Sequence, residues 1–387
     1  MFATSLRCLR CGRTEPVEPS AYICPHCGPG VTTADPGIFD VQYDYAAAAS
    51  AFLSSFSSRR RDIFRFLPLL PLEEAGNVLP VGDTPLVAAP RLAARLGLKA
   101  LYLKDETRNP TRCLKDRATA IAMTIAQTNG YQDLYCASAG NAAISLAGFC
   151  AHQGLTCHAF VPRIASPTRL DWLYRYGAQV HVSQGDYDQA YQEAEEAGAQ
   201  AGWYSRNCAF NPYLVEGKKT VAFEIAEQLD WQTPDLVVAP VGDGCTLGAT
   251  GKGFRELRML GQIERLPRLL GVQAEELQPV VRRYHRQMSS VATLESGETV
   301  AASIAVRRPR NYLRLRAELE ASHGTVLAVP DSEMLEAQRL LSQEAGIIAE
   351  VTSAATLAGL LRLAASQDLS GQRAVLIITG GRLDSNL

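Results

Sequence analysis

Short apolar runs alternate with amphipathic stretches along most of this 387-residue chain. Seven of the runs have the length and composition of buried strands, and helix-like stretches separate several of them. Strands that alternate with helices form parallel sheets covered by helices. Because the chain is too long for one ordinary core, we expect two such α/β units. The seven runs are 100–104, 134–138, 157–162, 179–183, 235–241, 269–274 and 374–379.

The charge balance and hydropathy of the chain exclude several classes of protein. Acidic residues number 40 and lysine plus arginine 38, which gives a net charge of −2. A general nucleic-acid binder would carry a basic excess, so no nucleic-acid partner is expected. The first residues contain no apolar signal-peptide core, and no run approaches the roughly 18 apolar residues of a membrane span. We therefore expect a cytoplasmic protein with no membrane partner.

Four of the ten cysteines lie within the first 27 residues. Cys8 and Cys11 form one C-x2-C pair, and Cys24 and Cys27 form a second pair after twelve intervening residues. Two such pairs supply four thiolates for a tetrahedral zinc, and a segment this small would hardly fold without one. A disulfide framework or a redox pair fits a cytosolic chain less well. We predict a zinc-ribbon-like segment whose metal is structural, because all four ligand positions are filled.

A glycine-rich loop follows the strand predicted at 235–241 and leads into a helix. The glycines at 242 and 244 let the backbone turn tightly and aim amide N–H groups at one point, near the positive end of the helix. Such a loop is suited to hold a phosphate. A purely structural turn and a dinucleotide-binding loop are the alternatives. The latter has the spacing G-x-G-x-x-G, whereas Gly248 comes one residue late.

Two further polar stretches follow predicted strands. Ser138, Gly140 and Asn141 lie between a strand and the start of a helix. Either the serine and the asparagine cap this helix, or Asn141 offers its amide to a ligand at the carboxyl edge of the sheet. Thr379 ends the last predicted strand and precedes two glycines. Its hydroxyl could bond a ring nitrogen, or the stretch could be a simple turn.

A lysine stands where the chain leaves a turn and enters a helix, in the stretch NPTRCLKDR at 109–117. Taken alone, Lys115 is most simply a solvated surface residue. However, it precedes Ser-x-Gly-Asn, the glycine-rich loop and Thr-Gly-Gly, and this order of four features resembles the fold-type II, tryptophan-synthase-β-like enzymes that depend on pyridoxal phosphate (PLP). The resemblance narrows to the threonine-synthase-like family through the cysteine segment, GDTPL (82–86), NPYLVEGKKTVAFEI (211–225) and EVTSAATLAGLL (350–361).

The resemblance implies a role for each of these residues. Lys115 would form the Schiff base with PLP and, once released, take the Cα proton of the substrate. Thr379 would meet the ring nitrogen with a neutral hydroxyl, which suits elimination more than transamination. Asn141 would contact the ring hydroxyl, and Ser138, Gly140 and Asn141 would bind the substrate. The cofactor phosphate would be held by Gly242, Asp243, Gly244, Cys245 and Thr246.

The family pattern breaks where a substrate phosphate would bind. Threonine synthase removes phosphate from O-phosphohomoserine, and the Asn-Ser-x-Asn-Pro-x-Arg stretch of that family supplies side chains to it. Here residues 208–214 are CAFNPYL, and Ala142 stands where the family usually has threonine. Loss of the arginine alone would forfeit a contact of roughly 1.5–3 kcal/mol. An uncharged leaving group therefore fits better, although compensating charge could come from Arg112, Arg163 or Arg206.

These considerations predict a PLP-dependent lyase of the threonine-synthase-like family that acts on a small amino acid. The expected reaction is elimination of hydroxide from serine or threonine, giving a 2-oxo acid and ammonia, or a β-replacement. Threonine synthase acting on O-phosphohomoserine is the alternative. A PLP-binding protein without catalytic activity is a further possibility, and the intact Lys115 and glycine-rich loop argue against it.

The placement of the motifs also predicts how the chain is organised. The zinc-ribbon-like segment takes residues 1–32, and a connector with the first part of the large PLP domain takes 33–110. A small mobile α/β domain follows at 111–210, and the remainder of the large domain takes 211–387. Closure of the small domain would exclude water and bring Asn141 onto the cofactor. We expect the enzyme to be a homodimer.

Overall fold

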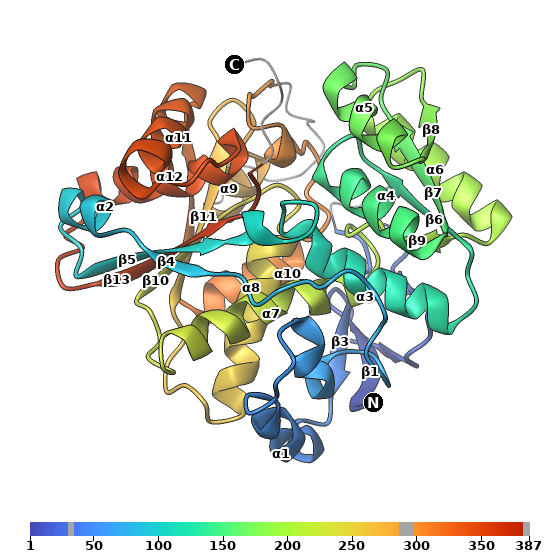
Figure 1. Ribbon diagram of the computed structural model, residues 1–387, viewed down its shortest axis with the longest axis horizontal. Coiled ribbons are helices and arrows are strands. Elements are labelled where there is room, and N and C mark those ends of the chain that lie inside the picture. The colour runs from blue at the N-terminus through green and yellow to red at the C-terminus, as the bar shows by residue number, and fades with distance from the viewer. Residues whose placement is uncertain (30–34, 286–296, 382–387) are drawn as a thin grey trace.

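The seven apolar runs all form strands, and they divide between two sheets (Figure 1). The computed structural model describes residues 1–29, 35–285 and 297–381. Helices flank both sheets, so the predicted α/β fold is confirmed. No helix within the described ranges has the length and apolar character needed to cross a membrane.

The larger sheet has six strands in the order β12-β11-β10-β13-β5-β4. Along β10, Val237 and Ala239 pack with one layer of helices, and Leu236 and Val238 pack with the other. Because both faces are covered, this strand is a continuous apolar run. The strands are β4 (Leu86–Ala88), β5 (Ala100–Asp105), β10 (Leu236–Pro240), β11 (Arg268–Ala274), β12 (Thr325–Val329) and β13 (Arg373–Ile378). One layer contains α7 (Tyr213–Gln228), α8 (Cys245–Met259) and α10 (Tyr312–Ala321), and the other contains α2 (Pro90–Arg95), α11 (Asp331–Ala345) and α12 (Val351–Ser366).

One edge of the larger sheet departs from the all-parallel prediction. β4 runs antiparallel to β5, with Leu86 opposite Lys104, whereas the other pairings in this sheet are parallel. Only residues 89–99 join these two strands. A parallel pair needs a crossover of roughly a dozen residues or more, usually with a full helix. The short connection therefore returns the chain in the opposite direction, and the sheet is mixed.

The smaller sheet has four parallel strands in the order β8-β7-β6-β9. Leu134 and Cys136 of β6 face the core shared with α3 and α4, and Tyr135 faces α6. As predicted, Gly154 ends α4 in the left-handed conformation, with φ 69°. The elements are α3 (Lys115–Thr128), β6 (Asp133–Ala137), α4 (Asn141–Gln153), β7 (Thr156–Val161), α5 (Pro167–Arg175), β8 (Gln179–Val182), α6 (Tyr187–Ala201) and β9 (Tyr204–Ser205).

The N-terminal segment forms a small antiparallel sheet in the order β2-β1-β3. The sulfur atoms of its four cysteines all lie within 4.8 Å of one another. The predicted boundary at residues 32 and 33 lies outside the described residues. The elements before β4 are β1 (Ala3–Cys8), β2 (Thr14–Glu15), β3 (Phe39–Tyr43), α1 (Tyr45–Ser55) and η1 (Ile63–Leu69). The remaining short helices are η2 (Glu106–Arg108), α9 (Pro279–Tyr284) and η3 (Ala302–Ile304).

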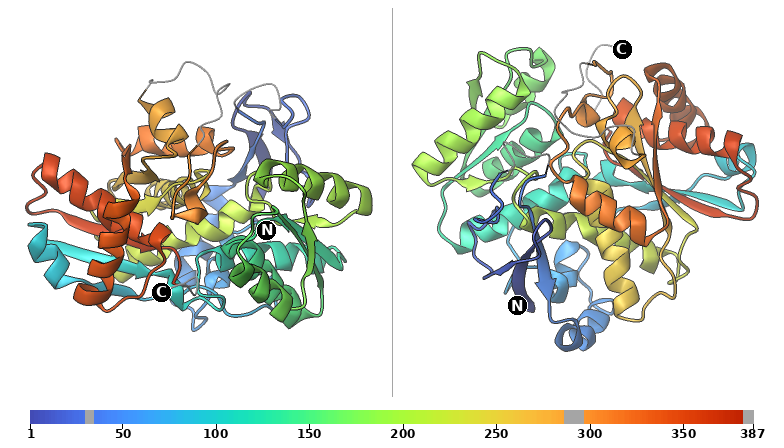
Figure 2. Two further views of the ribbon diagram at one scale, coloured as in Figure 1. Left: turned by 90° about the horizontal axis from the view of Figure 1, so that it is seen from above. Right: turned by 180° about the vertical axis from the view of Figure 1, so that it is seen from behind.

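Strand β3 ties this segment to the larger part of the molecule. The view from behind in Figure 2 shows the N-terminal strands beside α8 and α10. Asp40 of β3 pairs with Lys252 of α8 at 2.9 Å and with Arg314 of α10. Lys252 also donates to the carbonyl of Val41, at 2.7 Å. The segment is therefore anchored by buried charges as well as by apolar contacts.

A second group of buried charges fixes the start of α3. The guanidinium of Arg117 donates to Glu106 at 2.7 Å and to Glu224 at 2.7 Å, and Lys104 donates to Glu224 at 2.7 Å. All four side chains have no exposed surface. Burial alone would raise the pKa of Glu224, but Arg117 and Lys104 hold that pKa far below its usual range. These ion pairs join β5, η2, α3 and α7 two residues after Lys115.

We predict that Arg117→Met will lower the free energy of unfolding by about 3–5 kcal/mol, because it leaves Glu106 and part of the charge on Glu224 buried and uncompensated. Urea denaturation followed by circular dichroism measures this change. Arg339→Met is the matched control, since Arg339 pairs with Glu336 on the exposed surface, and it should change little. Equal unfolding midpoints for the two variants would contradict the stabilising role of the network.

Candidate active site

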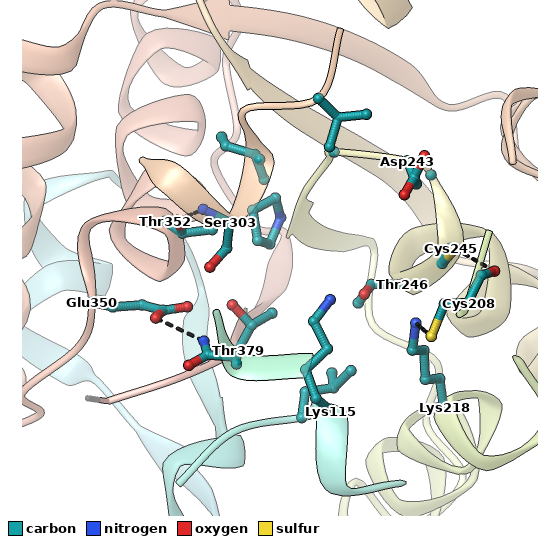
Figure 3. Close-up of a pocket in the computed structure, with 17 residues that line it drawn as sticks. Lys115, Cys208, Lys218, Asp243, Cys245, Thr246, Ser303, Glu350, Thr352 and Thr379 are labelled. Atoms are coloured by element: carbon teal, nitrogen blue, oxygen red, sulfur yellow. Dashed lines mark hydrogen bonds between the residues drawn. The ribbon is translucent and has the colours of Figure 1, made fainter. Parts of the chain in front are cut away.

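The loop before α3 is held against the end of β13, and this pairing sets the position of Lys115. The amide of Leu114 donates to the carbonyl of Thr379 at 2.8 Å. Cys113 forms an isolated antiparallel bridge with Gly380. Lys115 is the first residue of α3, so the helix carries its side chain away from this pairing and into a cavity (Figure 3). The structure therefore brings Lys115 beside Thr379, although the two residues lie far apart in the sequence.

The amine of Lys115 lies deep in the molecule among other basic groups. Burial lowers its pKa, and the positive charges of Lys218 and Arg206 lower it further, while the Cys208 sulfur acts in the opposite direction. A lysine with a lowered pKa is uncharged for more of the time at neutral pH and is a better nucleophile. Lys115 thus has the chemical character required of an amine that attacks a carbonyl.

The glycine-rich loop turns directly into α8. Gly244 precedes the helix with φ 93°, in the left-handed region that favours glycine. The first intrahelical bond runs from Gly248 to Gly244, so the amides of residues 245–247 precede the hydrogen-bonded turns. The loop is fixed from outside, because the Asp243 carboxylate accepts from the amide of Arg310 at 3.0 Å. This is a rigid site for an anion at the positive end of a helix.

The two other predicted polar positions are each held by a residue of α12 or its N-cap. Ser353 and Thr379 share a hydrogen bond of 3.0 Å between their hydroxyls. The side-chain amide of Asn141 donates to Glu350 at 2.9 Å. Since Asn141 begins α4 and Glu350 precedes α12, this bond links the smaller sheet to the larger one. Both groups therefore have a defined orientation toward the cavity.

The predicted site residues surround two adjoining cavities. The inner cavity, of about 90 Å³, includes Lys115, Asn141 and Thr379 in its wall. The outer cavity, of about 500 Å³, also reaches Lys115 and Asn141, and adds Ser138 and Gly140. Its size is that of a site for a small molecule. The glycine-rich loop completes the inner cavity with Gly242, Asp243, Gly244, Cys245 and Thr246.

The departures from the family pattern do not make this cavity uniformly apolar. Ala142, Cys208 and Ala209 line the outer cavity, as expected. Leu214 lines neither cavity, because α7 turns it into the hydrophobic core, where it is fully buried. The expectation that Leu214 lines the pocket is therefore wrong. Of the three arginines considered as substitutes, Arg206 is buried and lines the outer cavity, whereas Arg112 and Arg163 are exposed and line neither.

A cysteine lies between two basic groups at the junction of the cavities. Arg206 donates to the Cys208 sulfur at 3.1 Å, and Lys218 donates to it at 3.2 Å. Burial by itself would raise the pKa of the Cys208 thiol, but the charges of Lys218, Arg206 and Lys115 lower it to about 6. At neutral pH this residue is consequently a thiolate.

Sequence reasoning did not assign roles to several residues that line the inner cavity. Glu350 and Lys218 lie within stretches that carried the family resemblance, yet no role was assigned to either. Lys218 follows Leu214 by four residues, the spacing at which helical side chains are neighbours, so the helical period could have drawn attention to it. Ser303 and Thr352 were missed because no local pattern marks them. The amide of Ser303 donates to the Thr352 hydroxyl at 3.3 Å.

Sequence comparison places the chain among known enzymes. The family described as "Pyridoxal-phosphate dependent enzyme" matches residues 78–380. Threonine synthase of Methanocaldococcus jannaschii is 34% identical over 381 residues, which cover 97% of this chain and 91% of that protein. Threonine synthase of Methanosarcina acetivorans is 34% identical over 98% of this chain and 91% of its own length. The chain belongs to the threonine synthase family of PLP-dependent enzymes. It is accordingly a PLP-dependent lyase.

Solved structures agree with this fold. A threonine deaminase from the bacterium abbreviated T.th. has a TM-score of 0.67 and 25% sequence identity, over 79% of this chain and 94% of that one. The processed form of threonine deaminase isoform 2 from Solanum lycopersicum has a TM-score of 0.68 and 18% identity, over 96% of both chains. Both confirm the fold-type II architecture predicted for this member of the threonine synthase family.

The donor set of the inner cavity fits PLP. A buried amine of lowered pKa, a loop of amides at a helix N-terminus and a neutral hydroxyl match the aldehyde, phosphate and ring nitrogen of that cofactor. Among the reactions weighed from the sequence, the relatives support the alternative, threonine synthase, better than deamination or β-replacement.

The state of Cys208 can be measured directly. We predict that iodoacetamide will alkylate Cys208 with a rate that rises through a midpoint near pH 6, because the thiolate is the nucleophile and the neighbouring charges stabilise it. Peptide mass spectrometry over a pH series separates this site from the other cysteines. Lys218→Met should shift the midpoint upward. A midpoint near that of an ordinary thiol, about pH 8.5, would contradict this description of the site.

Proposed function

We propose that the protein is a threonine synthase, which converts O-phosphohomoserine and water into threonine and inorganic phosphate. The observation that carries the proposal is the arrangement of Lys115, the glycine-rich loop and Thr379 around one cavity, in a chain that matches threonine synthases along nearly its whole length. In this reaction the carbon–oxygen bond to phosphate breaks, and a water oxygen becomes the hydroxyl of threonine on the neighbouring carbon.

The cofactor would be held by residues from both parts of the molecule. Lys115 would bind it covalently through its amine, and the loop from Gly242 to Thr246 would bind its phosphate. Thr379 would hydrogen-bond the ring nitrogen, with its hydroxyl oriented by Ser353. Asn141 would bond the ring hydroxyl. When bound, PLP delocalises the negative charge that develops on the substrate Cα.

The residues of the chain then supply binding and proton transfer. Lys115 accepts the Cα proton, because burial and nearby charges keep its amine largely neutral. Ser138, Gly140 and Asn141 lie at the carboxyl edge of β6 and at the start of α4, where an anionic carboxylate is favoured. The hydroxyl of Ser138 already accepts from the amide of Gly140 at 3.1 Å, which shapes this turn. These groups would orient the substrate amino acid.

Deamination of serine or threonine is the second candidate function. It is favoured by the methyl groups of Ala142 and Ala209, which offer no donors to a phosphate in the outer cavity. Its products would be a 2-oxo acid and ammonium. The two candidates differ in what leaves the substrate, so one comparison of substrates distinguishes them.

Several larger features belong to the same proposal. Residues 111–210 would form the small mobile domain, and its closure would exclude water from the cavity. The Asn141–Glu350 bond is the contact that such a movement would make or break. A homodimer and a cytoplasmic location stay predictions from the sequence.

We also propose that the N-terminal cysteines hold a structural zinc. The sulfur atoms of Cys8 and Cys27 lie 3.9 Å apart, and those of Cys11 and Cys24 lie 3.8 Å apart. A tetrahedron with Zn–S bonds of about 2.3 Å has sulfur atoms about 3.8 Å apart. The spacing of the four sulfurs is thus suited to a zinc ion.

The substrate is tested by assaying the purified holoenzyme with O-phosphohomoserine, serine and threonine. We expect threonine and phosphate from O-phosphohomoserine, at a higher kcat/KM than 2-oxo acid from the other two substrates. Lys115→Ala should reduce the rate by at least about 1,000-fold, since it removes the amine that binds the cofactor and moves the proton. Borohydride reduction and peptide mapping should place the pyridoxyl group on Lys115. Faster deamination than phosphate release would establish the second candidate instead.

Metal analysis of freshly prepared protein should give about one zinc per chain. Cys24→Ser should lose that metal and unfold the N-terminal segment first, which limited proteolysis would detect as early cleavage before β3. Cys150→Ser is the control, because Cys150 is buried in α4 far along the chain from the cluster. Full metal content in Cys24→Ser would show that the four cysteines are not the site.

A further inference from the structure

Buried basic side chains in this protein are otherwise matched with carboxylates. Burying a charge without a partner is costly, so such matching is the expected arrangement. The pairs include Lys104 and Arg117 with Glu224, Lys219 and Lys252 with Glu216, Arg314 with Asp40, Arg65 with Glu227, and Arg310 with Asp188.

Arg206 and Lys218 differ from every other buried lysine or arginine in the described ranges. Each is about 1% exposed, and within those ranges neither has a carboxylate within 4 Å. The remaining donors of Arg206 contact the Thr119 hydroxyl at 3.1 Å and the carbonyl of Lys115 at 3.0 Å. Both basic groups share one sulfur, that of Cys208. One thiolate balances one of two positive charges, so an excess of positive charge remains.

This excess charge lies where a substrate would react. Lys218 and Cys208 line the inner cavity together with Lys115, and Arg206 and Cys208 line the outer one. Figure 3 shows Lys218 and Cys208 beside Lys115 and on the same side of it as Cys245. The carbonyl of Lys115 is itself a hydrogen-bond partner of Arg206, which fixes the guanidinium next to the reactive amine.

We propose that Arg206 and Lys218, joined by the Cys208 sulfur, form an anion subsite that binds the leaving group of the substrate. The identification of that anion as a phosphate monoester rests on the proposed function; the subsite itself does not. The two basic groups replace the charge that is missing at Leu214, from a different turn of α7 and from the end of β9.

The sulfur marks the position at which the two donors converge. It lies 3.1 Å from a guanidinium nitrogen and 3.2 Å from an ammonium nitrogen, distances close to those of a charge-assisted hydrogen bond. A phosphate has three oxygens and can accept from both donors at once, which a hydroxyl leaving group cannot do. Arg206 and Lys218 therefore favour a phosphorylated substrate over serine or threonine.

The subsite is tested with the wild-type holoenzyme and inorganic phosphate as the probe. Because the bound cofactor occupies the glycine-rich loop, added phosphate should slow alkylation of Cys208 by iodoacetamide at least about fivefold. Exposed Cys11 serves as the internal standard, and chloride at equal ionic strength is the salt control. No slowing of Cys208 alkylation by phosphate would overturn the proposal.

Variants at position 218 give a second measurement. Lys218→Met should raise KM for O-phosphohomoserine by about 10- to 100-fold, the loss of one charge-assisted hydrogen bond, and Lys218→Arg should recover most of it. Binding of homoserine, which lacks the phosphate, should change less than about threefold when followed by cofactor absorbance. An unchanged KM in Lys218→Met would overturn the subsite. If Lys218→Met does not fold, the phosphate protection of the wild type decides alone.

The two proposals fail in different ways. Phosphate protection of Cys208 without turnover of O-phosphohomoserine would leave the anion subsite standing and reject threonine synthase activity. Turnover without protection, and with an unchanged KM in Lys218→Met, would support threonine synthase activity and reject the subsite.

Discussion

The site depends on the buried guanidinium of Arg117. It holds the first turn of α3 against Glu106 of η2 and Glu224 of α7, and Lys104 of β5 completes the group. Because Lys115 lies two residues earlier, its backbone cannot shift without breaking ion pairs that have no access to water. Such pairs give little net stabilisation compared with apolar packing, but they cost much if one partner is lost. Their effect here is to fix one geometry for the amine.

The structure uses buried charge in two different ways. Around Arg117 and around Lys252, positive and negative groups are matched, and those regions are rigid joints between elements. Around Lys115, the two neighbouring basic groups share only a thiolate, and the lysine pKa is lowered as a result. The same residue types therefore serve as structural links where they are paired, and as a binding and reactive environment where they are not.

The sequence predicted the features that local pattern determines. Each buried strand is an apolar run because helices cover both faces, so all seven were found. Edge strand β12 was not predicted, since its residues are only partly buried and its pattern is weaker. The direction of β4 depends on the length of its connection to β5, which an apolar pattern does not describe. The ordered motifs predicted residues that the fold brings to one cavity, whereas the contributions of Lys218 and Glu350 depend on helix packing. Leu214 was misplaced for the same reason, because the side of α7 that faces the cavity is set by tertiary contacts.

Helix α8 connects two regions that are distant in sequence and in role. It begins at the glycine-rich loop, and about two turns later Lys252 binds Asp40 and the carbonyl of Val41 in the N-terminal sheet. If the cysteine segment loses its order, Lys252 keeps Glu216 as a partner but loses Asp40, and Arg314 loses its partner too. The strain of that unbalanced charge falls on the helix whose first amides form the phosphate loop. The N-terminal segment thus acts as a remote brace for cofactor affinity, although none of its described residues lines either cavity.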